Sequence, residues 1–266
     1  MREFEYVEGN LRRLLAYYAH SRETGETAES NGLVLSFCGS DYPMFNTAML
    51  AAPAPVSRHS LEARLLKALS YFAERHVRWS CWICRDLLEA SVRSTCSSIF
   101  QRLGFRLISD LPGMITEQHP PPARILPKVT FTPVGDSSSR LAFCQINAAA
   151  FDLPLAIIRD VYDTEEAWHH GLSGWVAFHG SEAVAIAATL ADGNSVGLYS
   201  VGVAPHARRR GFAEAVTRHA LDQSRRHAGV DRVILQSSIS GYRLYKHLNF
   251  REVTRFLVYG APEAPR

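Results

Sequence analysis

The chain has 266 residues, of which 47% are hydrophobic and 21% are charged, and its formal net charge is +3 at pH 7. At about 100 to 200 residues per domain this length fits two domains, and the apolar fraction can bury a core in each, which excludes a disordered chain. The charge is small and no apolar run approaches the ~18 residues of a membrane span, so we expect neither a nucleic-acid nor a membrane partner.

The N-terminal segment and the cysteines both favour the cytoplasm. The segment MREFEYVEGNLRRLL carries acidic residues where a secretory signal is basic and then apolar. The five cysteines are an odd number and are scattered, which fits a reducing compartment. Cys81 and Cys84 form a single C-x-x-C, which cannot complete a tetrahedral zinc site, and WSCWIC is typical of a strand. We therefore expect a cytoplasmic protein without a bound metal.

A proline-rich segment, EQHPPPARILPK at 117–128, separates the two halves of the chain. Three consecutive prolines and a fourth soon after favour an extended linker over a helix or a central strand. The sequence therefore predicts one domain at 1–126 and a second at 127–266.

Alternating and helical patterns then predict the elements of the second domain. After a strand at 129–134, Asp136 caps a helix that reaches Phe151, and a second helix covers 155–169. The remaining expectations, in chain order, are strands at 174–178, 183–190 and 196–203, a long helix at 211–227, a strand at 232–236, a short helix at 240–248 and a strand at 250–259. An antiparallel meander that leads into a β-α-β crossover gives a mixed, mostly antiparallel sheet flanked by helices, an α/β (α+β) fold.

The two halves share an internal similarity. IFQRLGFRLISDLPGM at 99–114 resembles LYKHLNFREVTRFLVY at 244–259, with Phe105 and Phe250 at equivalent positions. Each copy is a short helix that follows a strand and turns into another strand. Similarity at this separation predicts a duplicated fold.

The segment YSVGVAPHARRRGFAEAVTRHAL, from Tyr199 to Leu221, has the composition of an anion-binding turn. A strand ends at Val203, Pro205 breaks it, and Gly211 opens a helix, so consecutive backbone N–H groups and the helix dipole meet there. Gly211 allows close approach of a pyrophosphate, and Ala213 keeps the first turn small. The arginines Arg208, Arg209 and Arg210 add charge-assisted contacts.

These residues resemble a family. Arg208-x-x-Gly211-x-Ala213 is similar to the R/Q-x-x-G-x-G/A acyl-CoA signature of the GNAT (Gcn5-related) N-acetyltransferases, and Val201, Val203 and Pro205 precede it as in that family. The resemblance implies an acyl-CoA N-acyltransferase fold in each half, hence a tandem GNAT arrangement, with acetyl-CoA as cosubstrate. It also implies that Val201, Val203, the turn 208–213 (with Phe212) and Ser238 bind acetyl-CoA.

The segment SSISGYRLYKHLNF, 237–250, resembles the last motif of the family, in which a tyrosine lies near the CoA sulfur. Here that residue is Tyr245, which the resemblance makes both a CoA-binding and the catalytic residue, as the general acid that protonates the departing thiolate. Two positions depart from the family pattern. Ser238 replaces a common asparagine, and Asn249 replaces the glycine of L-G-F; asparagine tolerates the left-handed conformation, so the turn can be retained.

The first half lacks the corresponding features. Phe100, without a hydroxyl, stands at the position that matches Tyr245, and AAPAPVSRHSLEARLL at 51–66 has no glycine turn. We expect a degenerate GNAT-like domain whose duty is packing, covering the substrate cleft, or forming a homodimer.

The base that deprotonates the amine stays open at this point. Glu182 is a weak candidate, and Tyr199 and Ser200 could order a water, while strand N–H groups near Val201 and Val203 could hydrogen-bond the acetyl carbonyl.

We interpret the chain as an N-acetyltransferase that moves the acetyl group of acetyl-CoA to a primary amine of a small molecule, amino acid or peptide. The alternative is a non-catalytic acyl-CoA-binding or sensor protein. A nucleic-acid-binding protein that uses Arg208–Arg210 and Arg225–Arg226 is least favoured, because these residues lack interleaved aromatics.

Overall fold

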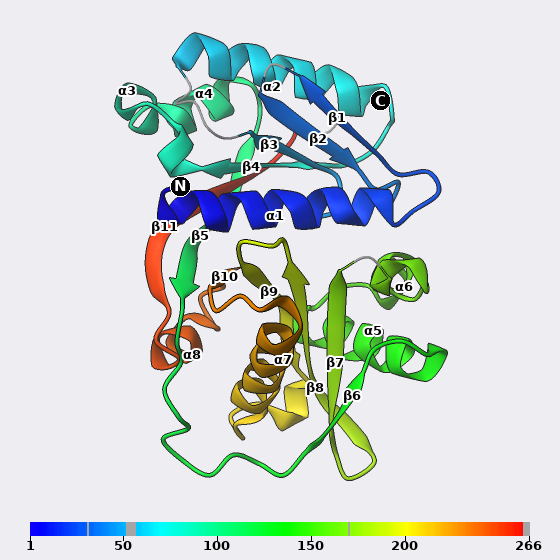
Figure 1. Cartoon of the computed structure of the whole chain (residues 1–266). Coiled ribbons are helices and arrows are strands. Elements are labelled where there is room, and N and C mark those ends of the chain that lie inside the picture. The colour runs from blue at the N-terminus through cyan, green and yellow to red at the C-terminus, as the bar shows by residue number, and fades with distance from the viewer. Residues whose placement is uncertain (31, 52–56, 170, 263–266) are drawn as a thin grey trace. The chain divides into compact units, whose positions relative to one another are not determined.

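The computed structural model describes residues 1–30, 32–51, 57–169 and 171–262 and divides into two compact units (Figure 1). Unit 1 comprises Met1–Met114, Gln236–Ile239 and Glu252–Arg266, and unit 2 comprises Ile115–Leu235 and Ser240–Arg251. The division differs from the predicted boundary, because the last strand of the chain is grouped with the first half.

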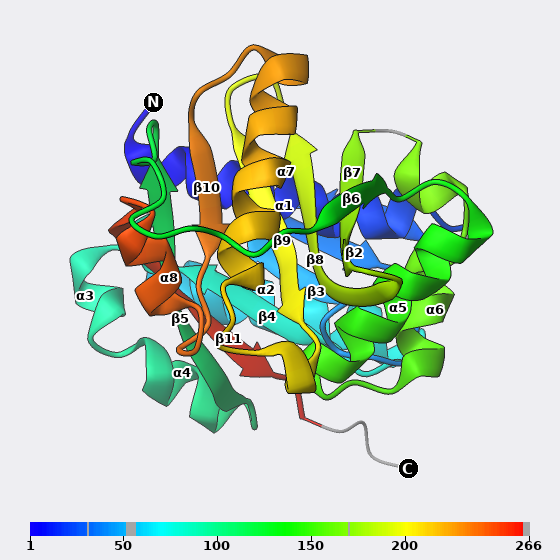
Figure 2. The same cartoon turned by 90° about the horizontal axis from the view of Figure 1, so that it is seen from below.

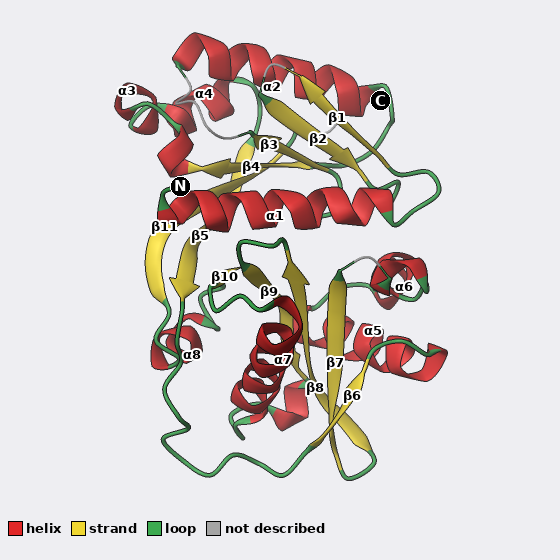
Figure 3. Cartoon of the chain, viewed as in Figure 1, coloured by secondary structure: helices red, strands yellow, loops and turns green. Residues whose placement is uncertain are grey.

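Unit 1 is a mixed sheet with helices on both faces (Figure 3). Its strand order is β1-β2-β3-β4-β11-β5, with β3 parallel to β4 and β4 antiparallel to β11. The elements are α1 (Glu3–His20), β1 (Glu26–Ser30), β2 (Leu33–Phe37), β3 (Thr47–Leu50), α2 (Arg58–Ala73), β4 (Ser80–Cys84), η1 (Arg85–Leu87), α3 (Ala90–Arg93), α4 (Cys96–Arg102), β5 (Arg106–Thr116) and β11 (Arg251–Gly260).

Unit 2 contains the predicted meander and crossover, in the strand order β10-β9-β8-β7-β6. The strands β6 to β9 are antiparallel neighbours, and β10 runs parallel to β9. Helix α7 covers one face of this sheet, and α5 and α6 cover the other (Figures 1 and 2). The elements are β6 (Thr130–Pro133), α5 (Ser137–Phe151), α6 (Leu155–Tyr162), η2 (Glu166–Trp168), β7 (Leu172–His179), β8 (Glu182–Ala191), β9 (Val196–Val203), η3 (Pro205–Ala207), α7 (Phe212–Ala228), β10 (Val233–Gln236) and α8 (Tyr242–His247).

The duplication predicted from the sequence is visible in backbone detail. The N–H of Phe105 donates to the carbonyl of Phe100 at 3.0 Å, and the N–H of Phe250 donates to the carbonyl of Tyr245 at 2.9 Å. The residue before each phenylalanine is left-handed, with φ 81° at Gly104 and 66° at Asn249. The expectation that asparagine keeps this turn is confirmed.

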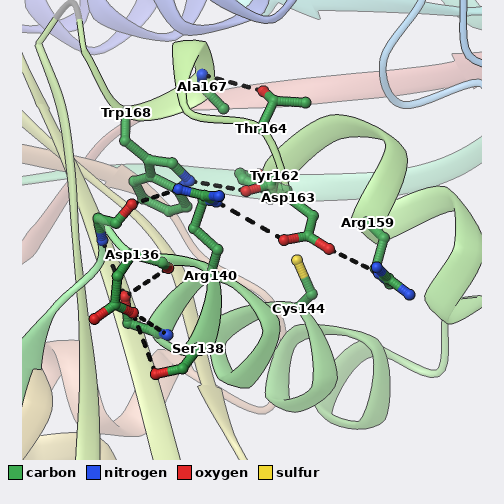
Figure 4. A network of polar contacts seen from close by, with 12 residues as sticks. Asp136, Ser138, Arg140, Cys144, Arg159, Tyr162, Asp163, Thr164, Ala167 and Trp168 are labelled. Carbon is green, nitrogen blue, oxygen red and sulfur yellow. Dashed lines mark hydrogen bonds and ion pairs between the residues drawn. The ribbon is translucent and has the colours of Figure 1, made fainter.

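The second helix of unit 2 is shorter than predicted, ending at Tyr162 instead of His169. The carboxylate of Asp163 pairs with Arg159 at 2.8 Å and with Arg140 of α5 at 3.8 Å, and the Trp168 indole N–H donates to the Tyr162 carbonyl at 2.8 Å (Figure 4). These contacts turn the chain away from the helix axis into η2. They involve partners from another helix, which a local periodicity does not contain.

Part of the segment 51–66 lies outside the described residues, namely 52–56. The described part is capped by Ser57, whose side chain accepts from the backbone N–H of Ser60, and continues as α2.

The sequence predicted cysteines outside a disulfide framework and no membrane span. All five cysteines are free and buried, and burial raises the pKa of the Cys84 thiol to about 11. Within the predicted strand WSCWIC, Ser80–Cys84 form β4. Among the described helices, none has the length and apolar character to cross a bilayer.

Candidate functional site

A β-bulge interrupts β9 just before its end. Ile186 pairs with Gly202 and Ala188 with Tyr199, so Ser200 and Val201 together face one residue of β8. Ser200 adopts φ 49°, a left-handed conformation that a non-glycine residue rarely takes. Such bulges redirect backbone groups and are frequent next to active sites.

The bulge lies in the part of β9 that pairs with β8 but not with β10. In the described part of the chain, β9 pairs with β10 only at Val196 and Gly197. Further along β9, toward its end at Val203, the described residues show no pairing with β10. This stretch includes the predicted residues Val201 and Val203, both half-buried. An N–H group without a strand partner can donate to an added acceptor, such as a carbonyl oxygen.

The chain then forms a turn with two left-handed residues. After η3, Arg209 has φ 62° and Gly211 has φ 89°, and α7 begins at Phe212. Among the described residues, no protein acceptor receives the backbone N–H groups of residues 209–213. Two left-handed residues just before a helix N-terminus turn successive N–H donors toward one side, an arrangement suited to an anion.

Some side chains of this turn make contacts within the protein, and others are exposed to solvent. Arg208 donates from Nη2 to the Ala150 carbonyl at 3.0 Å, so it ties the turn to the end of α5. Arg209 and Arg210 are exposed, and the Arg210 guanidinium lies 5.1 Å from the ring centroid of Phe212. The Phe212 ring is buried, while Ala213 is half-buried. Of the predicted arginines, two remain available to phosphates.

The proline-rich segment lies against this turn and along α7, which the sequence did not suggest. A Cβ on Gly211 would lie 3.1 Å from Cδ of Pro127. Further along the helix, Arg218 donates from Nη1 to the Pro120 carbonyl, and Arg225 donates from Nη2 to the Glu117 carbonyl at 2.9 Å. Two arginines seven residues apart share a helix face, and this spacing is the signal that could have revealed the contact.

Tyr245 lies on α8 with 8% of its surface exposed. Its ring meets Phe250 edge-on at 5.7 Å between centroids, and its hydroxyl has no hydrogen-bond partner among the described residues. Burial raises the pKa of Tyr245, so the phenol stays protonated throughout the physiological range. An uncommitted, protonated hydroxyl is what a general acid requires.

The remaining predicted residue, Ser238, is exposed and lies in the segment Gln236–Ile239 of unit 1. Its neighbour Ser237 donates from Oγ to the Ser238 carbonyl at 2.8 Å. Ser238 is thus the one predicted cofactor-binding residue that unit 2 does not contain.

The candidates for the base differ in their surroundings. Glu182 is exposed at the β7–β8 hairpin, 2.8 Å from the His206 ring nitrogen. Tyr199, predicted to help order a water, is buried, and burial raises the pKa of its phenol far above the usual range. The Ser200 hydroxyl lies 3.4 Å from the Tyr162 hydroxyl, a pair that could hold a water beside the bulge.

Comparisons with known proteins agree with this geometry. Residues 143–250 match the family model described as Acetyltransferase (GNAT) family. No curated protein matches.

Among solved structures, a GCN5-related N-acetyltransferase from Kribbella flavida has a TM-score of 0.76 at 18% identity, covering 99% of this chain and 97% of that one. Another, from Sphaerobacter thermophilus, has a TM-score of 0.60 at 17% identity, covering 88% and 78%. A tandem GNAT protein from the clavulanic acid biosynthesis pathway has a TM-score of 0.55 at 11% identity, covering 99% and 97%.

The family match spans the bulged strand, the N–H turn, α7 and Tyr245, and the structural similarity spans both units. The chain therefore carries a domain of the GNAT acetyltransferase family at residues 143–250, within a tandem arrangement of two GNAT-like folds.

Proposed function

We propose that this protein transfers the acetyl group of acetyl-CoA to a primary amine of a small molecule, amino acid or peptide. The observation that carries the proposal is the turn 209–213, whose backbone N–H groups have no acceptor among the described residues and suit a pyrophosphate. The exposed guanidinium groups of Arg209 and Arg210 add positive charge beside it.

In this proposal the thioester carbonyl lies beside the bulge of β9. The amine nitrogen forms a bond to the carbonyl carbon, and negative charge develops on the carbonyl oxygen. The backbone N–H groups near Val201 and Val203 stabilise this charge because their dipoles are already fixed in position. Val201 and Val203 are half-buried, which limits competing water.

The carbon–sulfur bond then breaks, and the phenol of Tyr245 gives its proton to the departing thiolate. The proton that the amine loses leaves to water, which the Ser200 and Tyr162 hydroxyls can hold at the bulge. Product amide and CoA thiol result, and the phenol regains a proton from solvent.

Acetyl-CoA should stabilise the protein against heat. A ligand at 100 times its dissociation constant adds about 2.7 kcal/mol to the free energy of unfolding of the unit that binds it. At ~2 to 4 °C per kcal/mol, the melting temperature should rise by several degrees. The measurement is a melting curve with and without acetyl-CoA, paired with an assay of CoA-thiol release across a panel of amines. An unshifted melting curve at saturating acetyl-CoA would refute the proposal, and a shift without turnover on any amine would favour the acyl-CoA sensor instead.

We also propose that unit 1 is a degenerate GNAT-like domain. Phe100, at the position equivalent to Tyr245, is fully buried and stacks on Tyr259 with ring centroids 3.7 Å apart and planes at 10°. The position that carries the acid in unit 2 is therefore used for packing in unit 1. A hydroxyl added to the ring of Phe100 would have to fit into the packed surroundings of this buried pair.

Calorimetry should give one acetyl-CoA per chain. Unit 2 holds the N–H turn, and Phe100→Tyr should add neither a second site nor activity, because the hydroxyl alone does not bind phosphates. A stoichiometry of two would show that unit 1 binds CoA as well.

A further inference from the structure

A pocket of about 540 Å³ lies in unit 2, between the second half of α7, the start of β7 and η2. This volume is within the range of about 300 to 1,000 Å³ typical of small-molecule sites. Sixteen of the described residues line it, and none of these sixteen is an aspartate, glutamate, lysine or arginine. A charged ligand would lose its hydration there without an opposite charge to replace it.

Aromatic rings form much of the lining. Phe131 and His219 stack with centroids 3.9 Å apart and planes at 7°, and Trp175 meets the His219 ring at 80° and 6.0 Å. Trp168 contributes a second indole. Such walls favour a planar ring, which stacks on their faces or meets their edges.

The lining is held in place by contacts that its own residues make with one another and with the neighbouring backbone. The Trp168 indole N–H is bonded to the Tyr162 carbonyl at 2.8 Å (Figure 4). A Cβ on Gly174 would lie 2.3 Å from Trp168, so the strand carries glycine where the indole crosses it. Across the sheet, the hydroxyls of Thr189 and Ser224 join β8 to α7 at 2.6 Å. The cavity is thus formed before any ligand enters, which lowers the entropic cost of binding.

Two half-buried polar side chains of the lining have no hydrogen-bond partner among the described residues, the ring of His219 and the amide of Gln223. Burial lowers the pKa of His219, so its ring is neutral at pH 7 and offers one N–H donor and one acceptor nitrogen. Half-buried polar groups without partners are expected to bond to water or to a ligand.

The pocket is remote from the site of acetyl transfer. Its described lining comes from β6, β7, the end of β8, η2 and the second half of α7, and includes no residue of the β9 bulge, the turn 209–213 or α8. Reacting atoms must approach to about 3 to 3.5 Å, so a molecule held by this lining is not placed as the amine that attacks a thioester at the bulge.

We propose that this pocket, defined by Phe131, Trp168, Trp175, His219 and Gln223, is a second small-molecule site that binds an uncharged planar aromatic or heteroaromatic compound. The ring of the ligand contacts the indoles and Phe131, and a hydrogen-bonding group on it meets His219 and Gln223. The site is independent of the acetyl-transfer activity proposed above.

The test uses the full chain labelled with 5-fluorotryptophan and observed by ¹⁹F NMR. The chain has four tryptophans, two in the pocket and two, Trp79 and Trp82, in unit 1. Indole should shift the Trp168 and Trp175 signals saturably, with a dissociation constant of about 1 mM or lower, and leave the other two unmoved. Indole-3-propionate, which is charged, and cyclohexylmethanol, which is not aromatic, should each bind at least about tenfold more weakly.

Matched variants locate the site. His219→Leu and Gln223→Leu should each weaken indole binding several-fold, whereas Arg226→Leu, on the same helix but outside the lining, should not. Gln223 is half-buried on α7, so its variant tests the proposal even if His219→Leu does not fold. Unmoved or unsaturable pocket signals, equal shifts at all four tryptophans, equal affinity for the charged or non-aromatic compound, or unchanged affinity in the Gln223 variant would overturn the proposal.

Discussion

Gly211→Asp should abolish the stabilisation by acetyl-CoA and lower its affinity by at least about 100-fold. The residue has φ 89° at the N-terminus of α7, where the side chain of any other residue is strained. Its Cβ would also approach Pro127 to 3.1 Å. A carboxylate at this point repels the phosphates that the turn is proposed to bind. At an effective dielectric of 20, the repulsion energy of two like unit charges 4 Å apart is about 4 kcal/mol. Calorimetry of acetyl-CoA binding measures the loss.

Gly229→Asp is the matched control, because Gly229 is also left-handed, at φ 63°, and ends the same helix. Nothing lies within 4 Å of a Cβ built there. Both substitutions strain a left-handed position and add one negative charge, so both should lower the melting temperature of the free protein. Only the Gly211 variant should lose the response to acetyl-CoA. An equal loss of the acetyl-CoA response in both variants would mean that the effect comes from lowered stability. An intact response in the Gly211 variant would show that the phosphates do not bind at this turn.

Elements specified by neighbouring residues were predictable from the sequence. The cap Asp136, whose carboxylate accepts from the Ser139 N–H at 2.7 Å, began α5 as expected. The left-handed Asn249 and the bond from Phe250 to Tyr245 followed from a short motif. In each case the partner atoms lie within five residues, so the pattern that encodes them is local.

Features that depend on distant partners were not predictable in the same way. The final strand was expected to complete the second domain, yet its Leu257 pairs with Ile83 of β4 in unit 1. A strand with apolar alternation can join either of two similar sheets, and its own sequence does not say which. Arg208 is a comparable case, because its bond to Ala150 depends on where α5 ends.

The bulge of β9 shows the same limit within the candidate site. The sequence YSVGV has the alternation of a regular strand, and Ser200 is not a residue that favours φ 49°. Helix α5 packs closely beside it: a Cβ on Gly202 would lie 2.9 Å from Cβ of Ala150. The extra residue of β9 lies where α5 contacts the strand, and the sequence of the strand itself contains no information about that helix.

Tyr245→Phe should lower the turnover number by about 100-fold or more while leaving acetyl-CoA affinity and thermal stability nearly unchanged. The hydroxyl has no hydrogen-bond partner among the described residues, so its removal breaks no bond of the free protein. The expected loss is that of a general acid in the transition state, typically 10²- to 10⁴-fold. Burial raises the pKa of Tyr245, so the wild-type enzyme should show no alkaline loss of turnover from this group below about pH 10.

Tyr242→Phe provides the control, since Tyr242 lies on the same short helix and is half-buried. A general weakening of α8 would affect both variants, whereas loss of the acid affects only the Tyr245 variant. Pre-steady-state measurement of CoA-thiol release separates chemistry from product release, because a slow product step would hide a slower chemical one. If Tyr245 only packs against Phe250, at 5.7 Å between rings, the single-turnover rate should change less than a few-fold, since such packing is retained by phenylalanine. That outcome would assign the protonation of the thiolate to solvent and leave the β9 N–H groups as the main catalytic contribution.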